Sequence, residues 1–252
     1  MANLNEIVGF LDEELNIAEI PDYGAAYNGL QVQNAGEVTK VAAAVDASLP
    51  VIRKAIEAEA DMLIVHHGLF WQGVQKLVGA QYDKFAEAIQ AGLAIYSAHI
   101  PLDMHPSFGN NALLAEAIGM DQAEAYHPWK GILLGLKQNM GCDLNELVQR
   151  VEAAVGGSVH FCPGRSEQNV GMVGVITGGA GSEIAAMAEQ GIDTFITGEG
   201  PHWSYPLAEE LGVNLIYAGH YQTETFGVKK MSELISQRWG VDSCFIDHPT
   251  GL

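Results

Sequence analysis

The stretches VAAAVDASLPVIRKAIEAEADMLIVHHG (residues 41–68) and VGVITGGAGSEIAAMAEQGIDTFITGEG (residues 173–200) align with one another without a gap, pairing Asp61 with Asp193. Each stretch holds two short apolar runs of strand length with a helical pattern between them. Self-similarity of this kind indicates that one structural unit occurs twice in the chain.

Both stretches continue into a further helical pattern and a third apolar run, which ends as IYSAH at His99 and as IYAGH at His220. A carboxylate follows four residues later in each case, at Asp103 and at Glu224. Strands that are apolar on both faces and alternate with helices indicate parallel sheets covered on each side. The sequence therefore predicts an α/β protein of two similar, intertwined lobes with mainly parallel sheets and a metal site in the cleft between them.

We expect the first lobe to comprise residues 1–125 and the second residues 126–252, with AYHPWKG as the junction and the two lobes packed as one compact unit. Asn3 and the apolar spacing after it predict a capped helix over residues 4–16. Strands are predicted at residues 41–45, 61–65, 93–97, 171–176, 193–197 and 214–218.

The composition is that of a folded globular protein, with 48% hydrophobic and 17% charged residues among 252. Asp and Glu outnumber Lys and Arg by 31 to 12, so nucleic acid and anionic membranes are poor partners. No apolar run approaches the roughly 20 residues of a membrane span, and the first residues do not resemble a secretory signal. We therefore expect a cytoplasmic protein, whose three separated cysteines are free thiols.

Polar side chains follow several of the predicted strands at their carboxyl ends, where α/β sheets bind ligands. Imidazoles and carboxylates without thiolates form a set that suits Zn, Mn, Fe, Co or Ni. The side chains at these ends are those of His66, His67, His99, Glu199 and His220.

Two of these residues, His66 and His67, are adjacent and would point to opposite faces of a regular strand. They can bind one ion only if the strand ends or bends, which Gly68 permits, and otherwise each serves its own ion. The alternative is that one of them is a core histidine that binds nothing.

The two repeated carboxylates have alternatives of the same kind. Asp103 is either a bridging carboxylate or a cap before the next helix. If a helix begins near Tyr221, His220 and Glu224 share one of its faces and can bind one metal. Otherwise Glu224 is an ordinary acidic residue in a first helical turn.

Further residues have weaker signals. His202 and Glu199 are candidates for moving protons during catalysis. The loop TGGAGS (residues 177–182) offers backbone amides that could hold an anion, although such turns are common without a ligand. The remaining histidines, expected on the surface or in loops, are His105, His127, His160 and His248.

These motifs resemble, in order and over essentially the whole chain, those of the YbgI-like dinuclear-metal family, the Nif3-like GTP cyclohydrolase 1 type 2 homologs. The matching segments are HHG (66–68), SAHIPLD (97–103), GGAGS (178–182), TGE (197–199) and GHYQTE (219–224). The resemblance implies two divalent metal ions per chain and a toroidal homohexamer. The implied metal ligands are His66, His67, Asp103, His220 and Glu224, with His99 near the metals as a further ligand or a support for the ligands.

The resemblance also implies a metal-dependent hydrolase similar to GTP cyclohydrolase 1 type 2, acting on GTP, another nucleotide or a phosphoester. Two ions would lower the pKa of a bound water for attack on carbon or phosphorus. The rival hypothesis is a non-catalytic metal-binding or regulatory assembly protein.

Overall fold

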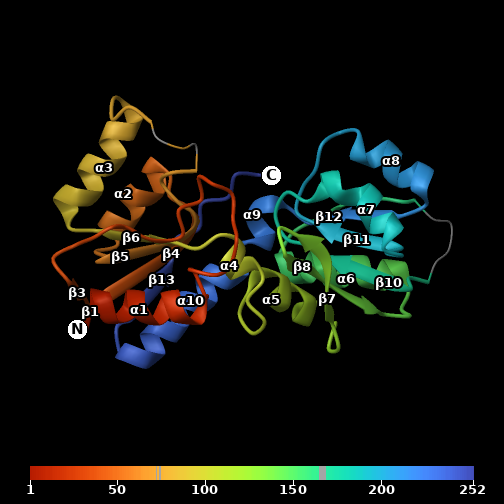
Figure 1. Cartoon of the computed structure of the whole chain (residues 1–252), viewed down its shortest axis with the longest axis horizontal. Coiled ribbons are helices and arrows are strands. Elements are labelled where there is room, and N and C mark those ends of the chain that lie inside the picture. The colour runs from red at the N-terminus through yellow and green to blue at the C-terminus, as the bar shows by residue number, and fades with distance from the viewer. Residues whose placement is uncertain (72, 74, 165–168) are drawn as a thin grey trace. The chain divides into compact units, whose positions relative to one another are not determined.

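The computed structural model describes the chain except for residues 72, 74 and 165–168, and it divides into two compact units (Figure 1). Unit 1 consists of Met1–Leu102 and Gly227–His248, and unit 2 of Asp103–Phe226 and Pro249–Leu252. The predicted boundary at residue 125 is therefore not where the structure divides. The chain leaves unit 1 earlier and returns to it because its last strand pairs with the first sheet.

Unit 1 is built on a five-stranded sheet with the strand order β13-β4-β5-β6-β2, and a two-stranded sheet pairs β1 with β3. All neighbours in the larger sheet are parallel except β2, which runs antiparallel to β6. The elements are β1 (Ala2–Asn3), α1 (Leu4–Glu14), β2 (Gly29–Val32), β3 (Glu37–Val38), β4 (Lys40–Asp46), α2 (Leu49–Glu57), β5 (Met62–His67), α3 (Ala80–Ala91), β6 (Ala94–Ser97), most of α10 (Thr225–Trp239) and β13 (Asp242–Phe245).

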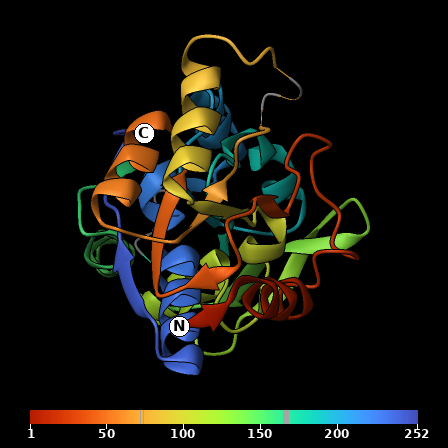
Figure 2. The same cartoon turned by 90° about the vertical axis from the view of Figure 1, so that its left-hand side faces the viewer.

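Helices cover both faces of this sheet, α2 and α3 on one and α1 and α10 on the other (Figure 2). Alternate strand residues such as Leu63 and Val65 join the core beneath α2 and α3. On the opposite face, Tyr96 of β6 donates a hydrogen bond to Asp12 of α1. Apolar side chains on both faces of β4, β5 and β6 are what a doubly covered sheet requires.

Unit 2 has a six-stranded sheet in the order β7-β8-β10-β11-β12-β9. Its centre, β10 to β12, is parallel, whereas β7, β8 and β9 pair antiparallel at the edges. After α4 (Ile100–Asp103), the elements are α5 (Asn110–Ala117), β7 (Glu124–Trp129), β8 (Ile132–Asn139), α6 (Leu144–Val155), β9 (His160–Cys162), β10 (Met172–Val175), the 3₁₀ helix Gly181–Glu183, α7 (Ile184–Glu189), β11 (Thr194–Thr197), α8 (Ser204–Leu211), β12 (Asn214–Tyr217) and α9 (His220–Thr223).

The segment AYHPWKG (residues 125–131), predicted as the junction, instead forms the last five residues of β7 and the two-residue turn that leads into β8. The core of unit 2 has two layers. Val173, Val175 and Ile196 pack with α5 and α6, and Phe195 and Leu215 with α7 and α8.

The repeat seen in the sequence is present in the structure, because β4-α2-β5-α3-β6 in unit 1 corresponds to β10-α7-β11-α8-β12 in unit 2. All six predicted strands form, and the helix predicted over residues 4–16 is α1, which ends at Glu14. Asn3 caps α1 by accepting hydrogen bonds from the backbone amides of Asn5 and Glu6. The α/β class is thus confirmed, with mixed rather than wholly parallel sheets.

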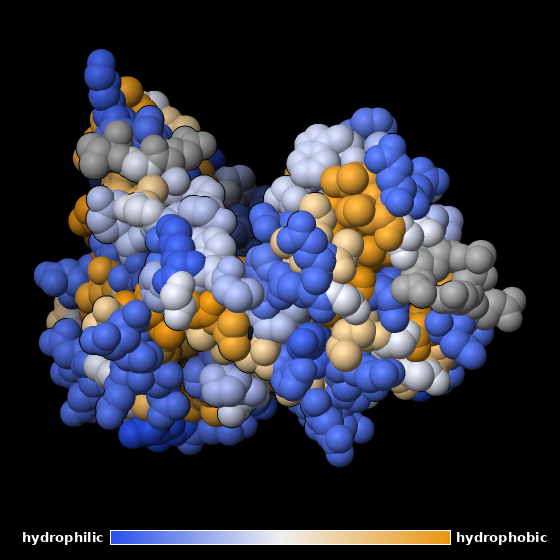
Figure 3. All heavy atoms as spheres, turned by 45° about the vertical axis from the view of Figure 1, so that its right-hand side comes forward, coloured by the Kyte–Doolittle hydropathy of each residue, from blue (hydrophilic) through white to orange (hydrophobic). Residues whose placement is uncertain are grey.

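Hydrophilic residues cover most of the face shown in Figure 3, with apolar patches between them. The three cysteines are free thiols. Among the described residues, no helix has the length and apolar character needed to cross a membrane.

Candidate metal centre

Unit 1 brings together three histidines, His66, His67 and His99, here called the imidazole cluster. The ring centroid of His66 lies 4.8 Å from that of His67 and 4.8 Å from that of His99. The ring centroids of His67 and His99 are 5.6 Å apart. One ring nitrogen from each lies within 4.8 Å of the others. Strand β5 ends at His67, and so the two adjacent histidines need not diverge as they would within a regular strand.

Each ring of the imidazole cluster has its Nδ1 atom bonded to an oxygen. The Nδ1 of His66 lies 2.9 Å from the carbonyl oxygen of Ala98, and that of His67 lies 2.9 Å from Asp46 Oδ1. Carbonyl and carboxylate oxygens only accept, so Nδ1 carries the proton in both rings. The lone pair is then on Nε2, the arrangement that outer hydrogen bonds commonly impose on metal-binding histidines.

His99 is held more extensively, although it lies in the loop after β6. Its Nδ1 lies 2.9 Å from Asp22 Oδ1, and its backbone amide donates to Asn28 Oδ1 at 2.7 Å. Asp22 also accepts from the amide of Ile100 and from Asn28 Nδ2. Burial opposes ionisation of Asp22, but its contacts with His99 and Asn28 outweigh burial and lower the pKa of the carboxyl. Asp22 therefore fixes both the position and the tautomer of His99.

Unit 2 contains a second group, formed by Glu199, His220 and Glu224 and here called the His220 group. His220 begins α9 and Glu224 follows its last residue, so the two share a face, as the i,i+4 spacing predicted. His220 Nε2 lies 3.1 Å from Glu224 Oε1, and His220 Nδ1 lies 2.8 Å from Glu199 Oε1. Glu224 is only 2% exposed, which does not fit an ordinary acidic residue in a solvated helical turn.

The two carboxylates change the charge state of His220. Burial disfavours the imidazolium, but the hydrogen bonds and charges of Glu224 and Glu199 outweigh it and raise the pKa of His220 to about 9. A proton on Nε2 then lies between His220 and Glu224 at neutral pH. A divalent cation at the same place would replace that proton, since metal binding requires a deprotonated ligand.

Asp103 also belongs to unit 2, where it is 6% exposed. Its Oδ1 accepts hydrogen bonds from Asn110 Nδ2 at 2.8 Å and from Thr177 Oγ1 at 3.2 Å. Asp103 does not cap α5, whose N-cap is Gly109 without a side-chain hydrogen bond. Asp103 is therefore not the cap of this helix. Its carboxylate is buried and oriented by two donors, as the carboxylates that bind metals commonly are.

The glycine-rich loop at residues 177–182 has a role other than the predicted one. The amides of Gly178, Ala180 and Gly181 donate to Thr223, Thr197 and Glu199 within the protein, which does not favour an anion cradle. A Cβ on Gly178 would lie 2.3 Å from Glu224 Oε1, and one on Gly179 would lie 3.6 Å from His220. The loop therefore makes room for the His220 group.

The other candidate residues are less closely tied to these groups. His202 is exposed, and among the described residues its imidazole makes no hydrogen bond or ion pair. His127, expected at the surface, is only 6% exposed in β7 because it packs beside Gln190, whose Nε2 lies 3.1 Å from His127 Nδ1. That expectation was wrong because β7 is part of a sheet. His160 is exposed, whereas His105, stacked on Phe108, and His248 are partly buried.

Sequence reasoning missed two of the carboxylates that hold the histidines, Asp46 and Asp22. Asp46 stands at the carboxyl end of β4, the position that singled out His66 and His67, and so could have been found from the same argument. Asp22 lies in an irregular segment far from His99 in the chain, and no local pattern marks it.

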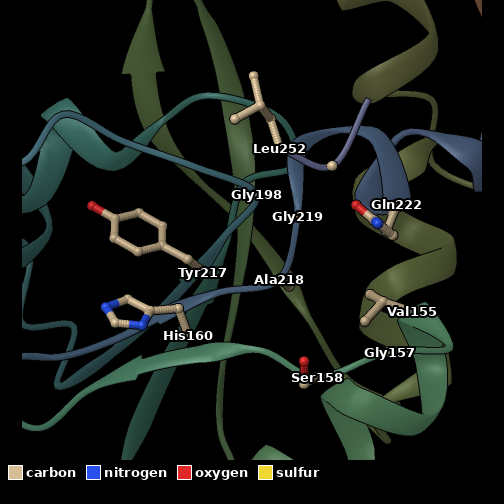
Figure 4. A pocket seen from close by; sticks show the side chains of 11 residues that line it. Val155, Gly157, Ser158, His160, Gly198, Tyr217, Ala218, Gly219, Gln222 and Leu252 are labelled. Atoms are coloured by element: carbon tan, nitrogen blue, oxygen red, sulfur yellow. The ribbon is translucent and has the colours of Figure 1, made fainter. Parts of the chain in front are cut away.

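A cavity of about 230 Å³ in unit 2 lies beside the backbone of the His220 group (Figure 4). Gly198 and Gly219, the residues before Glu199 and His220, form part of its lining. The rings of Tyr217 and His160 also line it and stack with an interplanar angle of 8°.

Comparison with known proteins identifies the family of the chain. The model of the Duf34/NIF3 (NGG1p interacting factor 3) family matches residues 2–251, so the chain belongs to this family. A protein of Deinococcus radiodurans named "GTP cyclohydrolase 1 type 2 homolog" is 38% identical over 250 residues, covering 98% of this chain and 94% of its own. A protein of the same name from Pyrococcus horikoshii is 40% identical over 254 residues, covering 98% and 99%.

Among solved structures, that of the protein ybgI, described as of unknown function, superimposes with a TM-score of 0.90. It is 33% identical in sequence and covers all of both chains. The α/β fold and the family membership are thus established together.

Proposed function

We propose that this protein binds two divalent metal ions and uses them for hydrolysis. The proposed ligands are His66 and His67 of unit 1 and Asp103, His220 and Glu224 of unit 2. His99 would serve as a further ligand or as a support for the ligands. The observation that carries the proposal is that His66, His67, His99 and His220 each have Nδ1 bonded to an oxygen. This leaves Nε2 as the donor atom for a metal in the first three, and in His220 once the metal replaces the proton shared with Glu224.

The chemistry of these donors supports a catalytic pair rather than a structural zinc site. Imidazole nitrogens and carboxylate oxygens without thiolates suit several divalent ions, and the identity of the metal depends on which ions are available. Five ligands shared between two ions leave coordination positions for a substrate, whereas a structural zinc is commonly closed by four protein ligands. Bound ions of this kind polarise a substrate oxygen and lower the pKa of a water molecule.

The residues around the donors would orient the histidine rings and transfer protons. Asp22 and Asp46 hold the rings of His99 and His67, and Glu199 holds that of His220. Glu199 is partly exposed, and it would also accept a proton from His220 or from a substrate group. His202, exposed on the loop before α8, is the second proposed proton carrier, and it would need to approach the substrate when the substrate binds.

The name shared by the relatives from D. radiodurans and P. horikoshii suggests the substrate. We propose a small molecule related to GTP or another nucleotide, opened or cleaved by attack of water. A homohexamer in the cytoplasm, expected from the resemblance and from the sequence, remains part of the same proposal.

Elemental analysis of the purified protein, combined with turnover of GTP and a panel of nucleotides and phosphoesters, tests this function. Native, chelated and metal-restored samples are compared. Two metals per chain, with turnover that is lost on chelation and restored with metal, are expected. Two metals without any turnover would favour a regulatory metal-binding assembly, and a protein that binds no metal would refute the proposal.

A further inference from the structure

A cavity of about 300 Å³ opens beside His67 in unit 1. Its lining includes Asp46 at the end of β4, Ser48 at the N-terminus of α2, Trp71, and Gln81 and Lys84 of α3. The cavity thus places a cation next to a proposed metal ligand, in a chain whose acidic residues outnumber its basic ones by 31 to 12. In so acidic a chain, Lys84 is a local positive charge and not one of many on a basic surface.

Lys84 is held in the cavity without a direct protein partner. Among the described residues, its ammonium group makes no hydrogen bond and no ion pair, and the side chain is partly buried. Burial lowers the pKa of Lys84, while the charge of Asp46 acts in the opposite direction. Asp46 itself is bonded to His67 Nδ1, so its carboxylate is already engaged. An ammonium group placed in this way is suited to a ligand with a negative charge.

Two neighbouring features point to the same kind of ligand. Gln81 and Lys84 are three residues apart on α3 and therefore share a face of the helix. The Oε1 atom of Gln81 is buried without a hydrogen-bond partner among the described residues, and no hydrogen bond fixes Nε2 either. The amide can therefore turn, and toward an anion it would donate from Nε2. Ser48, which lines the cavity, is also the N-cap of α2. The positive end of the α2 dipole therefore faces this wall of the cavity and favours an anion there.

We propose that this cavity binds the anionic group, a phosphate or a carboxylate, of the molecule that the metal centre acts on, with Lys84 as the charged contact and Gln81 as a neutral one. The inference rests on the proposed function, because His67 connects the cavity to the proposed metals. It adds the substrate class: a small molecule with an anionic group next to the bond or ring that is attacked. The alternative is that Lys84 only balances the charge of Asp46.

Titration with inorganic phosphate and, separately, with acetate tests the inference by calorimetry on the metal-loaded protein. Lys84→Gln is expected to weaken binding of the preferred anion by roughly tenfold or more, and Lys84→Arg to restore most of it. Whichever anion binds more tightly to the wild type identifies the group. The matched control is Lys230→Gln, which removes the same charge from α10 of unit 1 at a lysine paired with Glu233.

The outcomes separate the two proposals. Metal content, measured on the same samples, decides the proposed function, and the Lys84 dependence of anion binding decides the inference. Equal affinity in the wild type and Lys84→Gln would overturn the inference, as would the absence of binding of either anion to the wild type. A loss in Lys84→Gln that Lys84→Arg does not restore would also overturn it, because a charged contact should accept the conservative replacement. Thermal unfolding of each variant confirms that it is folded.

Discussion

The two repeats of the chain use the same frame of strands and helices for different sets of donors. At the carboxyl ends of the first repeat three imidazoles gather, with the carboxylates of Asp46 and Asp22 bonded behind two of them. In the second repeat a single imidazole, His220, lies between two carboxylates. The apolar pattern sets the frame, whereas a few residues at the strand ends decide whether nitrogen or oxygen donors are presented.

The aligned positions show how this difference arises. His67 of the first repeat corresponds to Glu199 of the second, so the second repeat has a carboxylate where the first has an imidazole. In the second repeat this carboxylate is bonded to Nδ1 of His220. Asp46 corresponds to Gly178, where a side chain would collide with Glu224. Each repeat therefore places one carboxylate on an imidazole Nδ1, but from a different strand.

The largest expected effect comes from Asp103, the carboxylate proposed to bridge the two ions. Asp103→Ala should lower the bound metal from two ions per chain toward one or none while the circular dichroism of the α/β fold is largely retained, because the fold rests on apolar strands. Elemental analysis after dialysis measures the stoichiometry. Retention of both metals would refute the bridging role, and His105→Ala is the control histidine variant outside the proposed ligands.

A smaller effect is expected from the carboxylates behind the rings, and here the two repeats can be compared directly. Asp46→Asn in the first repeat and Glu199→Gln in the second should each weaken metal binding by roughly 10–100-fold, the usual cost of losing an outer partner of a metal ligand. Competition with a chelator of known affinity measures the change. If Glu199→Gln alone had an effect, the imidazole cluster would not depend on its carboxylates, and the parallel between the repeats would be broken.

Gly178 offers a test of packing rather than of metal affinity. Its φ is +70°, and a methyl group would lie against Glu224, so Gly178→Ala should destabilise the protein by about 1–3 kcal/mol. Gly156→Ala is the matched control, because that glycine has a similar φ of +69° but nothing within 4 Å of the added carbon. Chemical denaturation of the two variants should therefore show a larger loss for Gly178. Equal losses would mean that the contact with Glu224 contributes nothing.

The sequence predicted what depends on periodic or repeated residues. The six strands and the placement of His66, His67, His99 and His220 at strand ends followed from the apolar runs and from the repeat. The domain boundary did not, because the parallel pairing of β13 with β4 joins residues far apart in the chain. Asp22 was missed for the same reason, since its bond to His99 spans a loop with no periodic pattern.

The prediction that His127 lies at the surface was wrong for a related reason. The motif AYHPWKG contains Pro and Gly and is predicted to be the junction of the two lobes, whereas its residues are in the β7-β8 hairpin at the edge of the sheet. Local turn residues identify a bend in the chain, but they do not reveal whether the flanking residues are buried.

The smallest expected effect compares a partly buried histidine, His220, with a buried one, His127, each of which has a glutamate nearby. His220 contacts two carboxylates within 3.1 Å, and its pKa is raised to about 9. Among the described residues, the acidic group paired with His127 is that of Glu183 at 3.6 Å, and burial lowers the pKa of His127 despite that charge. A histidine with a lowered pKa favours the folded state above its ordinary pKa of 6.5, and this contribution is lost as the pH falls below that value.

The free energy of unfolding should therefore decrease more between pH 7 and pH 5 in the wild type than in His127→Gln, which cannot titrate there. Urea denaturation of the chelated protein at several pH values measures the difference. The use of chelated protein is essential, because protonation of the metal ligands would otherwise add its own dependence on pH. An identical pH dependence in both proteins would show that Glu183 compensates for the burial of His127, as Glu199 and Glu224 do for His220.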